Sequence, residues 1–288
     1  MVVWPRRRAG DPSAAVERLT GRRRTLLRAN AIALVVCGIL LALAPAAGGG
    51  RVARAALDPS ASGHVVAFAR QSGVVVVRPP SGPDVVFRNA SQPALSGRYL
   101  AYVDSRGIRV VRWRNGEQVA RLTYHVARRP ALDWPRIAFV RRDPNRKRLI
   151  LRNFETGNMD VIASVRPSTD LGRPSLRHGR LAWHTGSTKR SRIKVLKLSN
   201  GARQTVARTR IGRLSNPSLH YRKVIWVDAR SGVTRLKQWR IGSRKRRVLA
   251  TVRSRAVSYW TTSRGPNACY TTRWMIASRA AEIHKRSC

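Results

Sequence analysis

Acidic residues and cysteines are scarce in this sequence. Only 13 Asp and Glu stand against 58 Lys and Arg among 288 residues, a formal net charge of +45. Of the basic residues 50 are Arg, which a GC-rich coding sequence would favour over Lys. Such a bias does not explain the scarcity of acids, because Asp and Glu also have codons that end in G or C. Hydrophobic residues make up 43% of the chain, which argues against a disordered basic tail and against a protein with many membrane spans. The charge therefore favours an anionic partner or surface.

Only one long apolar run is present, from Ala29 to Ala47. It follows a segment, 1–28, that holds eight Arg and two acids. A basic flank before an apolar run is typical of export segments. We expect 1–28 to be a basic cytoplasmic n-region, 29–47 a signal-peptide core or transmembrane anchor, and 48–56 a linker. The remainder of the chain is then extracytoplasmic, either secreted or tethered to the outer face of the cytoplasmic membrane.

Cleavage of this segment and its retention as an anchor are both compatible with the sequence. The run Arg23-Arg24-Thr25-Leu26-Leu27-Arg28 resembles a twin-arginine export signal. Small residues that suit a signal peptidase occur at Ala44-Pro45-Ala46 and Ala53-Arg54-Ala55, whereas Gly48-Gly49-Gly50 suits a flexible tether.

Export also changes how the three cysteines are interpreted. Cys37 lies in the apolar run, which leaves Cys269 and Cys288 in the exported part. An even number of cysteines in an oxidising compartment predicts a disulfide between these two. The alternative is two unpaired thiols.

No stretch of the exported part shows sustained helical periodicity, but a pattern recurs along it. A proline is followed nine positions later by an aromatic residue, and usually by Leu two positions later. Five copies have their prolines at 59, 93, 130, 174 and 217, and their aromatic residues are Phe68, Tyr102, Phe139, Trp183 and Trp226. A sixth, degraded copy places Thr261 at the proline position and Tyr270 at the aromatic position.

Each copy contains signals for four short strands. In the second copy, Pro93-Ala94-Leu95 predicts an inner strand, and 99–103, 108–113 and 118–122 predict three more, separated by Gly turns that include Asn115-Gly116. Four strands in a period near 40 residues are typical of a propeller blade. We therefore predict an all-β fold over 57–288, a six-bladed β-propeller of four-stranded antiparallel blades, with the repeated aromatic residues in its core.

The repeat resembles the WD-like repeats of the TolB propeller family. Ser96-Gly97-Arg98-Tyr99-Leu100-Ala101-Tyr102 and Leu122-Thr123 are similar to the family's turn, strand and closing Leu-Thr. The Asp of the family's Ser-Pro-Asp-Gly turn is missing from every copy. The resemblance implies a bacterial extracytoplasmic propeller but, as a likeness of fold, no particular function.

Residues that would carry catalysis do not group in the sequence. The exported acids are scattered, the six His occur one or two per copy, and Gly-x-Ser-x-Gly elbows, phosphate loops and sialidase-type boxes are absent. We expect no catalytic, cofactor-binding or metal-binding residues, no cofactor, and each His in a turn or on a strand surface. The prediction is a protein that is not an enzyme.

Basic runs remain at predicted hairpins: Arg141-Arg142, Arg146-Lys147-Arg148, Lys189-Arg190-Ser191-Arg192 and Arg244-Lys245-Arg246-Arg247. We expect them to form a basic surface that binds an anionic envelope component, such as lipid headgroups or a wall polymer, or an acidic protein. The leading hypothesis is a binding or scaffolding propeller of the cell envelope. The alternatives are an enzyme with a site in the central channel and a nucleic-acid-binding protein kept in the cytoplasm.

Overall fold

The computed structural model describes residues 51–287, with gaps at 55, 188–189, 254–256, 265–267 and 276–279. Side chains are described over 56–251 outside the gap at 188–189. The expected export segment at 1–47 lies outside the described residues. No helix within the described part of the chain is long and apolar enough to cross a membrane.

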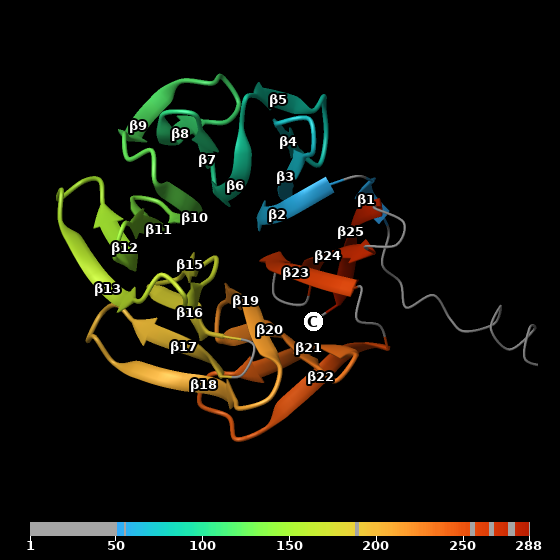
Figure 1. Cartoon of the computed structure of the whole chain (residues 1–288). Helices are drawn as coiled ribbons and strands as arrows, with labels where there is room; N and C mark the ends of the chain where they lie inside the picture. The colour runs from blue at the N-terminus through green and yellow to red at the C-terminus, as the bar shows by residue number, and fades with distance from the viewer. Residues whose placement is uncertain are drawn as a thin grey trace, which may run out of the picture. The chain divides into compact units, whose positions relative to one another are not determined.

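The described chain is an all-β propeller, and each blade is an antiparallel sheet with four strands across it, arranged around a common centre (Figure 1). Five blades are built from consecutive strands. Blade 1 contains β2 (Ala56–Ser62), β3 (Val65–Arg70), β4 (Val74–Arg78) and β5 (Val85–Arg88). Blade 2 contains β6 (Ser91–Ser96), β7 (Tyr99–Asp104), β8 (Gly107–Arg112) and β9 (Gln118–Leu122). Blade 3 contains β10 (Ala127–Asp133), β11 (Arg136–Asp143), β12 (Arg146–Asn153) and β13 (Met159–Val165).

Blade 4 has a divided innermost strand. It contains β14 (Asp170–Leu171), β15 (Ser175–Arg177), β16 (Arg180–Gly186), β17 (Ser191–Lys197) and β18 (Arg203–Thr209), and both β14 and β15 pair with β16. Blade 5 contains β19 (Arg213–His220), β20 (Lys223–Arg230), β21 (Val233–Arg240) and β22 (Arg246–Arg253).

The prediction of six blades, each made from one copy of the repeat, is corrected in its last copy. The final copy supplies three strands, β23 (Val257–Arg264), β24 (Ala268–Met275) and β25 (Ala280–Ser287). The fourth strand of this sheet is β1 (Arg51–Arg54), which pairs antiparallel with β25 and falls within the expected linker. Thus five blades form from consecutive strands in the described chain, and a further sheet is assembled from its two ends.

The repeated aromatic residues fill the core between blades, as the sequence predicts. Phe68, Phe139, Trp183 and Trp226 are at most 1% exposed, and Tyr102 is 5% exposed. Each lies on the second strand of its blade, which is buried on both faces, so residues on either side of the strand are apolar. Full burial of one such side chain contributes about 1.5–3 kcal/mol to stability.

Serine side chains join the innermost strands of neighbouring blades. The hydroxyl of Ser60 in β2 accepts a hydrogen bond from the backbone N–H of Leu95 in β6, at 2.9 Å. The hydroxyl of Ser175 in β15 accepts one from the N–H of Leu219 in β19, also at 2.9 Å. These bonds fix how far one blade slides along the next, so equivalent positions of successive blades lie at the same height around the centre.

The propeller has two faces, which we name by the innermost strands. The start face, where these strands begin, carries the turns 70–74, 104–107, 143–146, 186–191 and 230–233 and the links 88–91, 122–127, 165–170 and 209–213. The end face carries the turns between the first and second strands of each blade, 62–65, 96–99, 133–136, 177–180 and 220–223. It also carries the turns between the third and fourth strands, 78–85, 112–118, 153–159, 197–203 and 240–246. The assignment follows because alternate turns of an antiparallel meander lie at opposite ends of the strands.

Candidate functional sites

The innermost strands place one polar residue per blade toward the centre of the propeller. Each repeated proline follows a residue at an irregularity of the innermost strand, such as the register shifts at 57–60 and 91–94. We name these residues the pre-proline ring: Asp58, Gln92, Arg129, Arg173 and Asn216, and all five line one cavity. The backbone explains the direction of these side chains, because a bulge re-aims the residue that it displaces from the ladder.

Four members of the pre-proline ring have a left-handed backbone conformation. The φ angles are +51° at Asp58, +53° at Gln92, +60° at Arg129 and +48° at Asn216. This region disfavours residues other than glycine and costs each of them about 1–2 kcal/mol. A side chain is therefore kept at four positions where glycine would suit the backbone better.

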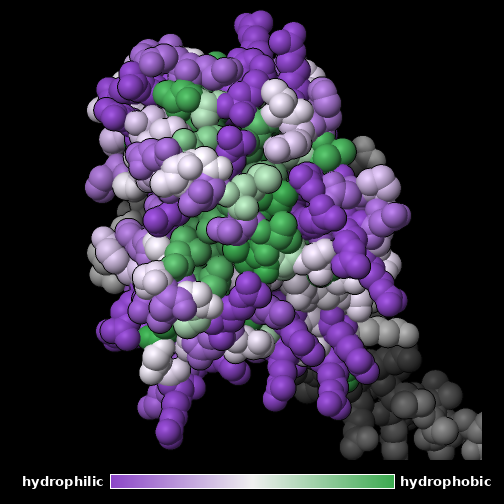
Figure 2. Space-filling model, turned by 90° about the vertical axis from the view of Figure 1, so that its left-hand side faces the viewer, coloured by the Kyte–Doolittle hydropathy of each residue, from purple (hydrophilic) through white to green (hydrophobic). Residues whose placement is uncertain are grey.

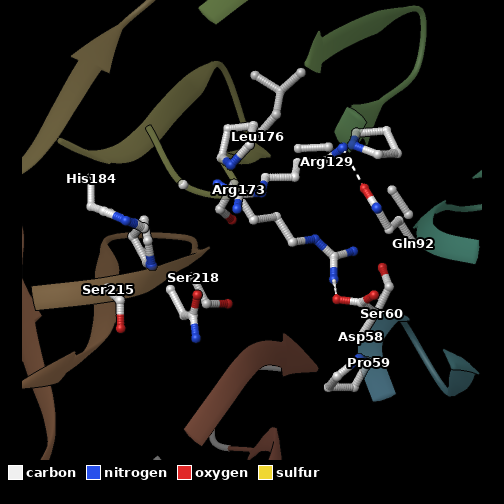
Figure 3. Close-up of a pocket in the computed structure, with 18 of the residues that line it drawn as sticks. Asp58, Pro59, Ser60, Gln92, Arg129, Arg173, Leu176, His184, Ser215 and Ser218 are labelled. Carbon is white, nitrogen blue, oxygen red and sulfur yellow. Dashed lines mark hydrogen bonds and ion pairs between the residues drawn. The ribbon is translucent and has the colours of Figure 1, made fainter. Parts of the chain in front are cut away.

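The central cavity has a volume of about 420 Å³ and is surrounded by the innermost strands of the five blades. Figure 3 shows its lining, with Arg173 extending from blade 4 toward Asp58 of blade 1. The Nη1 atom of Arg173 lies 3.5 Å from Oδ1 of Asp58, and another Arg173 N–H donates to the backbone carbonyl of Pro93. A single side chain thus connects blades 1, 2 and 4 across the cavity.

Burial opposes charge on both partners of this pair. Desolvation raises the pKa of Asp58 above its ordinary value, although Arg173 and Arg129 act in the opposite direction. Desolvation also lowers the pKa of Arg173, although Asp58 acts against this. The pair therefore lies where neither ion is well solvated, and burying it has a desolvation cost that two apolar side chains of similar size would not have.

Asp170 of β14 collects three basic side chains at the start-face side of the cavity. Its Oδ2 atom lies 2.6 Å from Nη2 of Arg213 and 3.0 Å from Nε2 of His184, and its Oδ1 atom lies 3.3 Å from Nη1 of Arg129. The hydrogen bond with His184, more than any other cause, holds the pKa of Asp170 well below its ordinary value. This carboxylate joins blade 3, blade 4 and blade 5 at one point.

His184 is part of this cluster and corrects the prediction that each His lies in a turn or on a strand surface. It is 3% exposed in β16, because its ring packs against Gly172, where an added Cβ would lie 1.6 Å from Cε1 of the imidazole. Its Nδ1 atom is buried without a hydrogen-bond partner. With Nε2 bound to Asp170 and Nδ1 buried, the imidazole of His184 orients the carboxylate.

Arg177 closes the cavity toward the end face. Its Nη2 group donates to the carbonyls of Ala61 at 2.5 Å and Leu95 at 2.7 Å, at the ends of β2 and β6. Burial lowers the pKa of Arg177, with the charge of Asp133 acting against this. At the opposite end of the cavity, the side chain of Arg213 is 55% exposed. The cavity therefore opens toward the start face.

Charged side chains are arranged differently on the two faces. The exposed charged residues of the described start-face turns and links are all arginines: Arg70, Arg88, Arg106, Arg146, Arg166, Arg190, Arg210 and Arg213. The acids of these turns are each held by at least two basic groups, as Asp143 is by Arg141 at 2.9 Å and Arg148 at 3.2 Å. The turns of the end face expose bases as well, but also the acids Asp84, Glu117 and Glu155.

The outer edge of the ring is also rich in charged side chains. Figure 2 views the side on which β12 and β13 lie, where hydrophilic side chains project outward around a hydrophobic area. Exposed hydrophobic residues of β13 include Met159 and Val161, which are 46% and 55% exposed.

The sequence-predicted residues fall in several places. The basic runs of blades 3 and 4 contribute Arg146 and Arg190 to the start face, whereas Arg244 lies on the end face. Cys269 is in β24, but its side chain is not among those that the structure describes. Cys288 lies outside the described residues, so the disulfide between Cys269 and Cys288 stays a prediction. Groups of three or more His, Cys, Asp or Glu suited to a metal are absent from the described part of the chain.

The pre-proline ring was missed by the sequence analysis. Its signal was present, because the residue before every repeated proline is polar. Basic runs were expected at hairpins, yet Arg129, Arg173 and Arg177, which lie outside those runs, line the centre.

Comparisons with known proteins identify the class but not a family. No protein-family model matches the sequence, and no curated protein matches it. Solved structures that resemble it include chains described as β-propeller domains. A chain from a nidogen/laminin complex is 15% identical with a TM-score of 0.54, covering 77% of this chain and 92% of that one.

Two microbial structures are similar at the same level. TolB from Acinetobacter baumannii is 12% identical with a TM-score of 0.52, over 77% of this chain and 59% of TolB. An acylaminoacyl peptidase from Pyrococcus horikoshii is 10% identical with a TM-score of 0.53, over 77% of this chain and 43% of the peptidase. At these identities the likeness establishes the propeller fold and carries no activity with it.

Proposed function

We propose that this protein is a non-enzymatic, extracytoplasmic binding propeller that holds an anionic component of the cell envelope against its start face. The observation that carries the proposal is the single sign of the exposed charge in the described start-face turns. The expected export segment at 29–47 supports an envelope location. In this proposal the sheet of β1 and β23–β25 serves as the sixth blade and closes the ring.

The ion pairs inside the start face support this interpretation. Asp104 lies 3.4 Å from Nε of Arg109 and also contacts Arg121, so one carboxylate faces two guanidinium groups. Asp143 has the same arrangement with Arg141 and Arg148. Since each acid is outnumbered where it stands, it does not offset the field of the exposed arginines. An anionic surface attracts such a face with about 1 kcal/mol per Arg close to it.

Binding of the full-length chain to vesicles tests the proposal. The start-face variant carries Arg146→Glu, Arg190→Glu and Arg210→Glu, and the end-face control carries Arg114→Glu, Arg222→Glu and Arg244→Glu. All six residues are exposed and the two variants have equal net charge. On phosphatidylglycerol vesicles at low salt, we expect the start-face variant to bind about 100-fold more weakly than the unchanged protein.

The end-face control should lose much less affinity, and binding should weaken as salt is raised. Equal losses in the two variants would contradict the proposed face. Equal retention of the unchanged protein on phosphatidylcholine and phosphatidylglycerol vesicles would contradict the anionic partner, and would assign binding to the apolar segment. A preference for duplex DNA over the vesicles under the same conditions would favour the nucleic-acid alternative instead.

A further inference from the structure

We propose that the central cavity is a binding site for a small organic molecule that carries two negative charges. This site shares Arg213 with the start face, whose other exposed arginines lie outside the cavity lining, and it does not depend on the proposed function. The ligand would enter from the start face, past Arg213, and lie among the side chains of the pre-proline ring.

The balance of charge in the cavity supports a dianion. Four guanidinium groups line it, those of Arg129, Arg173, Arg177 and Arg213, whereas Asp58 and Asp170 are the charged acids of the lining. Two positive charges are therefore left without a counter-charge in the described lining. An excess of like charge in a partly desolvated site is costly unless an anion accompanies it.

The two acids are already engaged, so they do not cancel the remaining charge. Asp170 binds Arg129, Arg213 and His184, and Asp58 binds Arg173. Asp133 acts on the charge of Arg177 from outside the lining, and the hydrogen bonds of Arg177 go to two backbone carbonyls, which carry no formal charge. Its guanidinium and the outnumbered arginines around Asp170 supply the unbalanced charge at two ends of the cavity.

The backbone of the pre-proline ring gives an independent reason to expect a ligand. Asp58, Gln92, Arg129 and Asn216 have positive φ angles, and none of these positions is glycine. Backbone strain of this kind persists where the side chain has a use, and it clusters at binding sites. Four of the five copies thus share this backbone conformation and differ in the side chain that it displays, as a set of recognition positions requires.

The size and walls of the cavity limit the ligand to a small molecule. Its volume of about 420 Å³ lies in the range of small-molecule sites, which is about 300–1,000 Å³. The rings of Pro59, Pro130, Pro174 and Pro217 provide apolar wall between the polar side chains. Arg177 spans the end-face side of the described lining, from β15 to the ends of β2 and β6. Planar guanidinium groups bind both carboxylate and phosphate oxygens with paired hydrogen bonds.

Calorimetric titration of the full-length protein tests this site, with succinate and inorganic phosphate as the probes and succinamide as the uncharged analogue of succinate. We expect saturable binding of at least one dianion at one molecule per chain, and no binding of succinamide. Binding of succinate alone would identify a dicarboxylate, and binding of phosphate alone would identify a phosphorylated compound.

Two variants of equal net charge locate the binding. Arg213→Gln removes a partly exposed guanidinium at the opening of the cavity, and we expect it to weaken the dianion at least tenfold. Arg244→Gln removes an exposed charge on the end face and should leave affinity unchanged. Circular dichroism and thermal unfolding establish that both variants are folded. The start-face triple variant should still bind the dianion, which separates this site from the proposed surface.

Absence of saturable binding for both dianions would overturn the proposal. Equal weakening by Arg213→Gln and Arg244→Gln would also overturn it, since the effect would then be one of overall charge. Binding of succinamide as tight as that of succinate would remove the requirement for negative charge.

Discussion

The start face and the end face differ in what their acids do. On the start face, Asp104, Asp143 and Asp170 each contact at least two basic side chains. On the end face, Asp84 pairs with Arg78 alone, and Glu155 has no ion pair among the described residues. The start-face acids thus each connect several basic side chains, whereas Asp84 and Glu155 lie as separate exposed charges on the end face. A count of charges in the sequence does not reveal this difference, because it depends on which strands lie side by side.

The largest effect should come from removing the carboxylate at which three blades meet. Asp170→Asn leaves Arg129 and Arg213 without their counter-charge and weakens the contact with His184. Asp170 is 28% exposed, so we expect the free energy of unfolding to fall by about 2–3 kcal/mol, less than for a fully buried pair. Urea denaturation measures the change. Glu155→Gln, the end-face counterpart, should change stability by less than about 0.5 kcal/mol. Equal effects would remove the distinction between the faces.

A smaller effect should follow from adding one methyl group beside the cavity. In Gly172→Ala the new Cβ would collide with the His184 ring, which must move and so disturb its bond to Asp170. We expect a loss of about 1–3 kcal/mol by thermal or urea unfolding. Gly97→Ala on the end face meets no atom within 4 Å and has only the cost of its φ of +54°.

The two substitutions separate steric from conformational cost. Gly97→Ala should cost about 1 kcal/mol and leave the cavity intact. Gly172→Ala should also weaken the binding of the dianion. If Gly97→Ala affected that binding as much as Gly172→Ala does, the role given to the contact between Gly172 and His184 would be wrong.

The smallest effect concerns pH and lies on the end face, where solvent screens the partly exposed side chain of His220. Burial, together with His178, Arg177 and Lys223, lowers the pKa of His220 from 6.5 to about 4. A lowered pKa means that the unfolded chain takes up the proton first as the pH falls, so stability is lost between these two values. Urea denaturation at steps from about pH 7 to pH 4 should show this decline, and a titration by NMR should give the shifted value directly. The loss should be reduced in His220→Gln, and an unchanged slope would contradict the assignment.

Asp170 should add its own loss of stability at lower pH. Its pKa in the folded state is held below 3.8, chiefly by the hydrogen bond with His184. Its contribution is present above that value and is lost as the pH falls further. The losses of stability linked to His220 and to Asp170 should therefore fall in separate pH ranges, that of His220 first.

Much of the fold was predictable because the repeat is a pattern of core residues. Trp183 and Trp226 are buried at the places that their spacing from proline predicts, and the Asn115-Gly116 turn joins β8 to β9. Such residues obey local rules of periodicity and turn chemistry. The last sheet was harder, since a repeat that supplies three strands does not disclose that β1 provides the fourth.

The cavity was not predictable from the same rules. A residue before proline is typical of a turn or an extended segment. The sequence does not predict that the φ angle of this residue is positive or that its side chain points to the centre. The pairing of Arg173 with Asp58 joins residues of opposite blades, and it depends on closure of the ring. Side chains that meet only through such closure leave no spacing signal along the chain.

The pairing of β1 with β25 has a consequence for the order in which the molecule can fold. β1 is the first described strand to be synthesised and β25 is the last, yet each is the other's neighbour in the sheet. Five blades can form by contacts between segments close in sequence, whereas this final pairing closes a loop that spans almost the whole described chain. Contacts of such long range form slowly. We therefore expect the pairing of β1 with β25 to form late in folding, after the five blades have formed.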